Sequence, residues 1–269
     1  MSKEIHLITR ADDGGSNHTA NIAIYEACQK GIVKNISLMA TCSAIEEAAR
    51  MFEDLHDVCF GVHLTMNAEW DNIKWGSVLP VERVSTLVDE SGFFSPTVSA
   101  LKARGVKVDE VFAEMTAQLN RLRELGFAIA YADEHMFFGN AIEGFSSIFD
   151  AWCQAEGLLN HRHYQRELPK IVQHDAMNVE HFINTISAAP SGQYVVIGHP
   201  AYDTEEMRAL GHAGYEGDVV ATSRDMERKL FMDYRVLKYF KSNQVVPIRY
   251  DEAVEISKAQ ELGQRRIRA

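Results

Sequence analysis

The sequence predicts an α/β fold in which a parallel sheet is wrapped by helices. Short apolar runs alternate with longer amphipathic stretches, which is the pattern of repeated strand–helix units. The length of 269 residues suits a single barrel-sized α/β domain. Because no repeat, low-complexity tract or Pro/Gly-rich linker divides the chain, we expect residues 1–269 to form one domain.

Six apolar runs are the predicted strands, at 5–9, 35–40, 58–65, 128–133, 194–199 and 245–250. Apolar residues recur at helical spacing in the stretches between them and predict helices at 17–30, 43–54, 109–126 and 224–240. Ser43 and Glu46 have the spacing of a capping box, which predicts where the second helix begins.

Residues 67–108 differ from the rest of the chain. Their periodicity is weaker and they contain several turn residues, as in "DNIKWGS" and "DESGFFSP". We expect an irregular insertion after the third strand, and such segments often form a wall of a binding site.

Composition excludes several classes of function. A net charge of -11 and a pI near 5.5 argue against a nucleic-acid or membrane-surface partner, and the single basic run, 265–268, predicts a solvated tail. The four cysteines have no CxxC spacing and predict reduced thiols. Neither a secretory signal nor an apolar stretch of membrane-spanning length is recognisable, so we expect a cytoplasmic protein.

Four predicted strands end in side chains that can bind a metal or transfer a proton. These are Asp12 and Asp13, His63, Asp133 and His135, and His199. The C-terminal ends of parallel strands share one face of the fold, where active sites are usually built. The sequence therefore predicts that these groups meet in one pocket.

One carboxylate and two imidazoles make a ligand set for a divalent metal with open coordination positions. We assign Asp13, His63 and His135 to this set and expect Mg²⁺ or Zn²⁺. Asp12 then remains free to act as a base on water, and Asp133 can orient an imidazole from outside the ligand set.

Each element of this site also has a simpler interpretation. Adjacent aspartates before Gly-Gly commonly form turns, a histidine in an apolar strand is often a core residue, and His199 could be a turn residue before its proline. The joint placement of all four strand ends favours the metal site. The rival pair, His161 and His163 around Arg162, would lie on one side of a strand without a nearby acid and predicts an exposed polar loop.

With these residues identified, the chain resembles the YdjC-like carbohydrate deacetylases, the group that includes chito-oligosaccharide deacetylases. The likeness runs from "ADDGGSNHTANIAIYEACQKGIVKNISLMA" through "FGVHLT" and "LRELGFAIAYADEH" to "IGHPAYD" and "SRDMERKLFMD". It implies a distorted TIM-like (β/α) barrel that removes acetyl groups from N-acetylated amino sugars with one divalent metal ion.

Carried over by position, the resemblance gives each candidate a role. The second acid of the family's "DD" is a ligand and the first is the catalytic base, while a late histidine is the acid that protonates the leaving amine. By this resemblance Asp13 matches the ligand, Asp12 the base and His199 the acid. His63 and His135 match the other two ligands, and Arg224 matches the arginine of the "R-x-x-E" block.

Two positions depart from the family pattern. Gly14 replaces the aromatic residue of "DDFG", which removes a ring from beside the site. Phe137 replaces the second histidine of "D-x-H-x-H" and is expected to reshape the pocket around the substrate.

Two other classes of function stay open. One is a metal-dependent sugar isomerase or phosphohydrolase, for which the Gly-Gly at 14–15 is a weak phosphate-loop candidate. The other is a sugar-binding or regulatory barrel without catalysis. The expected partner is a small carbohydrate, and a homodimer is an assembly that the sequence leaves open.

Overall fold

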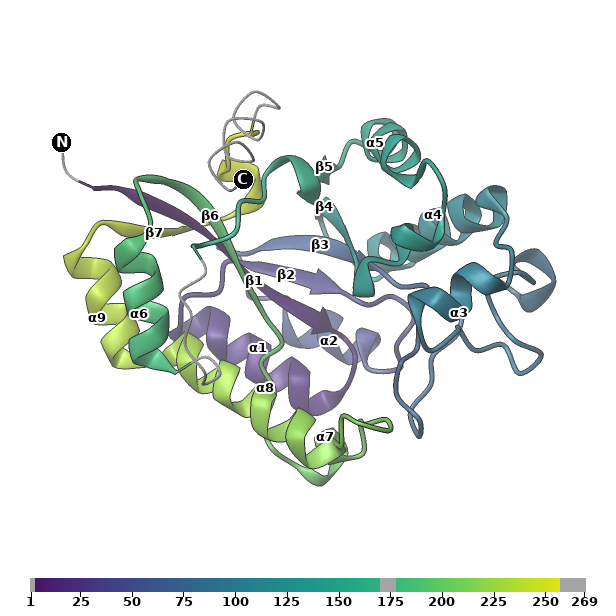
Figure 1. Ribbon diagram of the computed structural model, residues 1–269, viewed down its shortest axis with the longest axis horizontal. Coiled ribbons are helices and arrows are strands. Elements are labelled where there is room, and N and C mark those ends of the chain that lie inside the picture. Colours follow the sequence, from purple (N-terminus) through teal and green to yellow (C-terminus); the bar gives the residue numbers. More distant parts are fainter. Residues whose placement is uncertain (1–2, 170–177, 257–269) are drawn as a thin grey trace.

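The computed structural model describes residues 3–169 and 178–256, and its framework is a parallel sheet (Figure 1). The strand order is β5-β4-β3-β2-β1-β6, and β7 also pairs with β1. The strands are β1 (Ile5–Gly14), β2 (Asn35–Leu38), β3 (Cys59–Leu64), β4 (Ile129–Glu134), β5 (Leu159–Asn160), β6 (Gly192–Gly198) and β7 (Val245–Ile248).

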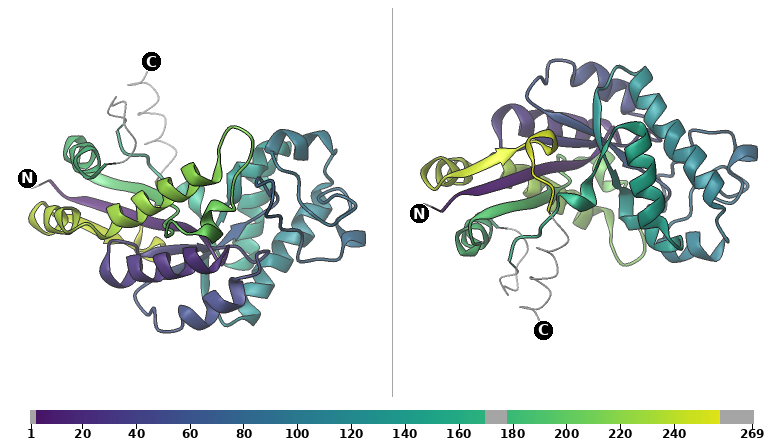
Figure 2. Two further views of the ribbon diagram at one scale, coloured as in Figure 1. Left: turned by 90° about the horizontal axis from the view of Figure 1, so that it is seen from below. Right: turned by 90° about the horizontal axis from the view of Figure 1, so that it is seen from above.

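Helices follow most of the strands, as the alternating pattern predicts. They are α1 (His18–Lys30), α2 (Ile45–Met51), α3 (Val98–Ala103), α4 (Val108–Glu124), α5 (Phe145–Glu156), α6 (Val179–Ala188), α7 (Glu205–Arg208), α8 (Gly217–Met232) and α9 (Tyr234–Ser242). The helices α1 and α8 contact each other along one side of the sheet, and α4 packs on β3 and β4 (Figure 2). The C-terminal ends of β2 and β3 point toward the part of the molecule that contains α3 (Figure 1).

One edge of β1 is shared by two strands. Its first residues pair with β7 from Ile5 to Ile8, and its last residues pair with β2 from Arg10 onward. The buried amide of Asn35 joins the three strands, because its Nδ2 donates to the carbonyls of Thr9 and Ile248. The other edge of β1 pairs with β6.

The sheet curls around an apolar interior. One cluster joins side chains of strands that are far apart in the sheet, such as β4 and β6. It contains Ile8 of β1, Cys59 of β3, Tyr131 of β4, Val195 of β6 and Ile248 of β7. The chain after β5 then reaches the opposite edge, where Glu167 forms a bridge with Val195 of β6. The predicted barrel-like α/β fold is therefore confirmed, as a curled parallel sheet.

The boundaries of three elements differ from the predictions by more than two residues. The predicted helix 224–240 is wrong, because Asp233 ends α8 and its side chain accepts a hydrogen bond from Arg235 N at the start of α9. The predicted capping box is also wrong: α2 begins after Ala44 and has no side-chain cap. The strand predicted at 5–9 continues to Gly14, so both aspartates belong to β1.

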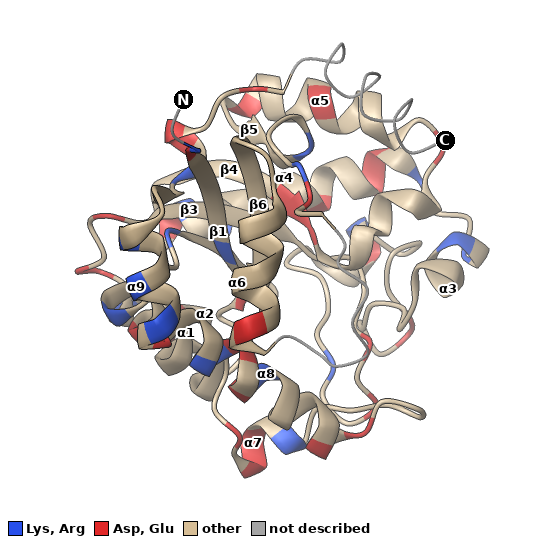
Figure 3. Ribbon diagram, turned by 60° about the vertical axis from the view of Figure 1, so that its left-hand side comes forward, with Lys and Arg blue, Asp and Glu red and all other residues tan. Residues whose placement is uncertain are grey.

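Acidic and basic residues are intermixed over the face of the molecule that Figure 3 shows. The cysteines are free thiols, and three of them are buried. Among the described residues, no helix combines the length and apolarity needed to cross a membrane. The basic run 265–268 lies outside the described residues.

Candidate metal centre

The two adjacent aspartates reach the same buried site because β1 is irregular at its end. Side chains of a regular strand alternate between its two faces. The pairing of β1 with β2 shifts register between Ala11 and Gly14, and Asp13 has a φ of 63°, which interrupts this alternation. Left-handed backbone at a non-glycine residue is costly and tends to occur at functional sites.

The structure brings the three predicted ligands together. His63 Nε2 lies 3.1 Å from His135 Nδ1, and Asp13 Oδ1 lies 3.7 Å and 3.6 Å from these two nitrogens. Ligands that share one ion at about 2.1 Å lie about 3.0–3.4 Å apart. The distance between the two histidines lies in this range, and the two distances to Asp13 are a few tenths of an ångström longer, so a small movement of Asp13 would let the three groups share one small divalent ion.

Asp13 keeps one oxygen without a partner. Its Oδ2 accepts a hydrogen bond from Arg224 Nη1 at 2.7 Å, but its Oδ1 is buried and has no hydrogen-bond partner. Burial alone would raise the pKa of Asp13, but the charges of Arg224 and of His199, His135 and His63 lower it well below its usual range. The carboxylate therefore stays ionised, and its free oxygen faces the two imidazoles.

His63 is oriented by the neighbouring strand. Asp133 is its register partner on β4, and Asp133 Oδ1 lies 3.0 Å from His63 Nδ1. Burial alone would lower the pKa of His63, but the charges of Asp133, Asp12 and Asp13 raise it to about 9. The surrounding carboxylates thus favour a positive charge at this position, which is either a proton or a metal ion.

Arg10 connects the acids on the floor of the site. Its Nε and Nη2 donate to the two oxygens of Asp12 at 2.6 Å and 2.9 Å, and its Nη1 lies 2.7 Å from Asp133 Oδ2. Although burial lowers it, these two carboxylates raise the pKa of Arg10 well above its usual value. One buried cation therefore contacts both carboxylates, and although burial alone would raise the pKa of Asp133, the charge of Arg10 helps to lower it. Sequence reasoning missed Arg10.

His135 is oriented from the insertion. Its Nδ1 faces the ligand cluster, and its Nε2 lies 3.0 Å from Glu69 Oε2. Each histidine of the centre therefore has a carboxylate on the ring nitrogen that points away from the cluster, an arrangement common around protein metals. Sequence reasoning missed Glu69, since 66 residues separate it from His135 and no local motif marks it.

His199 lies outside the ligand cluster, directly after β6. Its imidazole is 39% exposed, and its Nδ1 lies 3.6 Å from Glu227 Oε2. Burial alone would lower the pKa of His199, but the contact with Glu227 and the charge of Asp13 raise it. The histidine can therefore hold a proton within reach of solvent.

The two departures from the family pattern have different surroundings. A Cβ on Gly14 would lie 2.8 Å from Ile36 Cγ2, so a side chain at this position would point at β2. The expectation that Gly14 removes an aromatic ring from beside the site is therefore wrong. Phe137 is 55% exposed and, like Met136, has left-handed backbone directly after His135.

The rival histidine pair forms no shared site. Residues 161–163 are a short 3-10 turn, where His161 is buried near Glu134 and His163 lies 2.6 Å from Asp150. The prediction of an exposed loop is therefore wrong for His161. Within 3–169 and 178–256, the possible metal-binding groups are the ligand cluster and an overlapping set of Asp12, His63 and Asp133.

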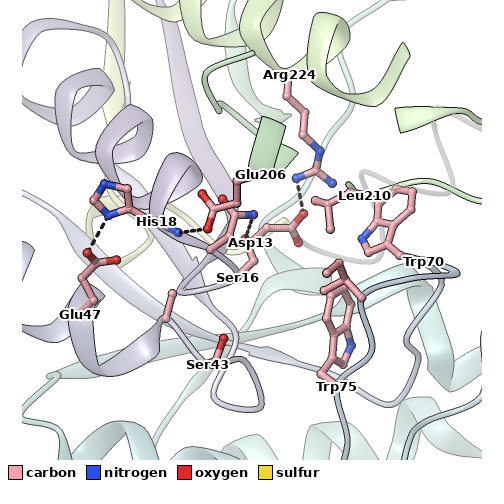
Figure 4. Close-up of a pocket in the computed structure, with 13 residues that line it drawn as sticks. Asp13, Ser16, His18, Ser43, Glu47, Trp70, Trp75, Glu206, Leu210 and Arg224 are labelled. Atoms are coloured by element: carbon pink, nitrogen blue, oxygen red, sulfur yellow. Dashed lines mark hydrogen bonds and ion pairs between the residues drawn. The ribbon is translucent and has the colours of Figure 1, made fainter. Parts of the chain in front are cut away.

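A cavity of about 370 Å³ adjoins the ligand cluster and has Asp13 in its wall. Figure 4 shows Trp70 and Trp75 on one side of Asp13, and His18 with Glu47 on the other. Trp70 also stacks on His212 and lies under the Arg224 guanidinium. Residues of the irregular insertion thus form the aromatic wall of the cavity.

Side chains of α4 hold that wall in place. Glu114 accepts hydrogen bonds from Val78 N and Leu79 N at 2.8 Å and 3.0 Å. One turn further along, Gln118 bonds both the N–H and the carbonyl of Thr65, at 2.9 Å and 2.8 Å. Both side chains are fully buried, so α4 holds residues 78–79 within the insertion and Thr65 just before it.

Comparisons with known proteins agree with the resemblance. The chain is 26% identical to a carbohydrate deacetylase of Thermoanaerobacter pseudethanolicus, over 91% of this chain and 98% of that protein. It is 32% identical to a carbohydrate deacetylase of Geobacillus stearothermophilus, over 48% and 49% of the two chains.

Solved structures share the fold. An Enterococcus faecalis protein described as a "putative cellobiose-phosphate cleavage protein" superposes with a TM-score of 0.79 at 20% identity, over 93% of this chain and 100% of that one. A peptidoglycan N-acetylglucosamine deacetylase domain of Eubacterium rectale gives 0.53 at 9% identity, over 96% and 94%. The model of the YdjC-like protein family matches residues 6–242. The chain therefore belongs to the YdjC-like family.

Proposed function

We propose that the protein is a metal-dependent hydrolase that removes the acetyl group from an N-acetylated amino sugar or a short oligosaccharide. The observation that carries this proposal is the buried cluster of Asp13, His63 and His135, in which one Asp13 oxygen has no partner. Membership of the family and relatives named carbohydrate deacetylase support the same reaction.

Asp13, His63 and His135 would hold one divalent ion, for which we propose Mg²⁺ or Zn²⁺. When bound, such an ion polarises the acetyl carbonyl and makes water more acidic. Asp133 and Glu69 keep the two histidine rings turned toward the cluster, and Arg224 holds Asp13 in place.

Asp12 is the general base and His199 the general acid. Asp12 accepts the proton that the attacking water loses; Arg10 fixes its carboxylate, whose oxygens retain further lone pairs. The water oxygen bonds to the acetyl carbon, the C–N bond breaks, and His199 gives its proton to the amine nitrogen. The products are acetate and the free amino sugar. We also propose that the ring of Phe137, which is 55% exposed two residues after His135, contacts a part of the sugar that extends out of the cavity.

Acetate release from a panel of N-acetylated mono- and oligosaccharides, with and without a chelator, tests this function. We expect release from at least one sugar, its loss with the chelator, and its return when a divalent ion is added. Release that a chelator does not affect would contradict the metal dependence, and no release from any sugar would contradict the reaction class.

A further inference from the structure

The charged residues that line the cavity beside the metal centre determine whether it can bind a phosphorylated sugar. Its ionisable lining residues are Asp13, Glu47, Glu206, Arg224 and His18. Binding of a phosphate normally requires a cation or several N–H groups that have no other anionic partner.

Both cationic candidates among these lining residues are already paired. Arg224 Nη1 donates to Asp13 Oδ2 at 2.7 Å, and His18 Nδ1 lies 2.6 Å from Glu47 Oε1 (Figure 4). A phosphate in the cavity would have to compete with a carboxylate for either of them.

The N-terminus of α1, which also faces the cavity, is occupied by the protein's own carboxylate. Thr19 N donates to Glu206 Oε2 at 2.9 Å, and His18 N lies 3.4 Å from Glu206 Oε1. The next N–H, of Ala20, donates to the Asn17 side chain. Glu206 therefore takes the place at which a helix would otherwise attract an anion.

The remaining lining suits an uncharged sugar. Trp70 and Trp75 offer apolar ring surface, while Ser16 and Ser43 offer hydroxyl groups. Pockets for small molecules commonly combine apolar walls with a few such polar groups.

We propose that the cavity binds the amino sugar in its unphosphorylated form, and that Glu47 and Glu206 exclude sugar phosphates. This proposal rests on the proposed function, because it places the sugar beside Asp13. The two carboxylates add negative charge to a lining whose cations are already paired, so they oppose the binding of a phosphate and determine specificity.

Equilibrium binding provides the first test, with an N-acetylated amino-sugar disaccharide and its phosphate monoester as ligands. The full-length protein is measured after metal removal, because a bound divalent ion would itself attract phosphate. We expect the phosphorylated ligand to bind weaker by about tenfold or more. Equal or tighter binding of the phosphate ester overturns the proposal, and so does binding of neither ligand.

Charge variants provide the second test. We expect Glu47→Gln and Glu206→Gln to reduce the discrimination several-fold, and Glu47→Lys to favour the phosphate ester. Glu46→Gln is the matched control, since Glu46 is adjacent on α2 but pairs with Arg121 at 3.7 Å and does not line this cavity. Circular dichroism checks that Glu206→Gln, which alters the cap of α1, still folds, and unchanged discrimination in a folded Glu47→Gln overturns the proposal.

The two proposals can fail separately. A protein that prefers the unphosphorylated disaccharide but releases no acetate from it refutes the reaction and leaves the specificity standing. A protein that deacetylates both forms with equal KM refutes the specificity and leaves the reaction standing.

Discussion

The ligand cluster and the aromatic wall of the cavity are positioned by different kinds of structure. Asp13 and His63 lie within strands of one hydrogen-bonded sheet, and His135 follows another. The wall belongs to the irregular insertion, which α4 holds through Glu114, while Gln118 holds Thr65 just before it.

The residues proposed to bind the metal are therefore positioned independently of those that shape the cavity. Strand register is shared by many backbone hydrogen bonds, so one substitution elsewhere does not move a ligand. The wall depends on a few buried side chains, so one substitution in α4 can displace it. Glu69 is the point where the two regions meet, because it comes from the insertion and contacts a ligand.

The largest expected effect comes from removing a ligand. We expect His63→Ala to lose its metal and to reduce turnover by about 10³-fold or more, at least as much as any loss of the general acid. Metal analysis and turnover measure this, with His163→Ala as a control outside the cluster. Wild-type turnover and metal content in His63→Ala, with activity abolished in His199→Ala, would show that the roles are wrong.

Removal of the general acid should leave the metal in place. We expect His199→Ala to lower kcat by about 10²–10⁴-fold, the range for one general acid, with metal content unchanged. Unchanged kcat would remove His199 from the mechanism.

Glu69 tests the junction between the two regions. Loss of a carboxylate that orients a metal-binding histidine typically costs about 10–100-fold in metal affinity. We therefore expect Glu69→Gln to weaken metal binding by that amount, measured by competition with a coloured chelator. Asp71→Asn, an exposed neighbour in the same segment, is the control, and equal affinities in both variants would count against the contact.

Gln118 tests how α4 holds Thr65, which lies between His63 and the wall. Gln118→Ala leaves the N–H and carbonyl of Thr65 without their partner, and we expect it to lower the free energy of unfolding by about 1–3 kcal/mol. We also expect KM to rise more than kcat falls. Asn120→Ala, exposed on the same helix, should change stability by no more than about 0.5 kcal/mol. A fall in kcat alone would contradict a role in holding the wall.

The smallest expected effect is a shift in pH dependence. Glu227 helps to raise the pKa of His199, so the protonated acid persists above its ordinary range and is lost as pH rises through the raised value. Because Glu227→Gln removes this influence, its activity should fall at a lower pH. The alkaline limb of kcat/KM measures the shift, and a limb that does not move would exclude this role of Glu227.

The sequence predicts the ligand cluster because the ends of strands can be recognised from apolar runs, and parallel strands place their C-terminal ends on one face of the fold. Asp13, His63 and His135 each stand at the end of a recognisable apolar run, and the structure brings them together. The same reasoning could not distinguish where a side chain at position 14 would point, because the register shift after Ala11 has no local signal.

Apart from Arg10, which contacts Asp12 two residues along the same strand, the missed residues act across long separations in sequence. Glu47 faces His18 from another helix, and Glu69 reaches His135 from the insertion. His18 shows no pairing pattern in the sequence, although it lies in the cavity wall. Such contacts depend on how the insertion and helices pack, which periodicity alone does not determine.

The shared edge of β1 has a consequence for the order in which the protein can be completed during synthesis. The first half of β1 is made before both of its neighbours, because β6 and β7 come much later in the chain. Asn35 closes the junction only when the carbonyl of Ile248 is present. A nascent chain that already carries both aspartates and β2 therefore still lacks β6 and β7, and the strand that bears Asp12 and Asp13 gains its full set of neighbours only after β7 has been made.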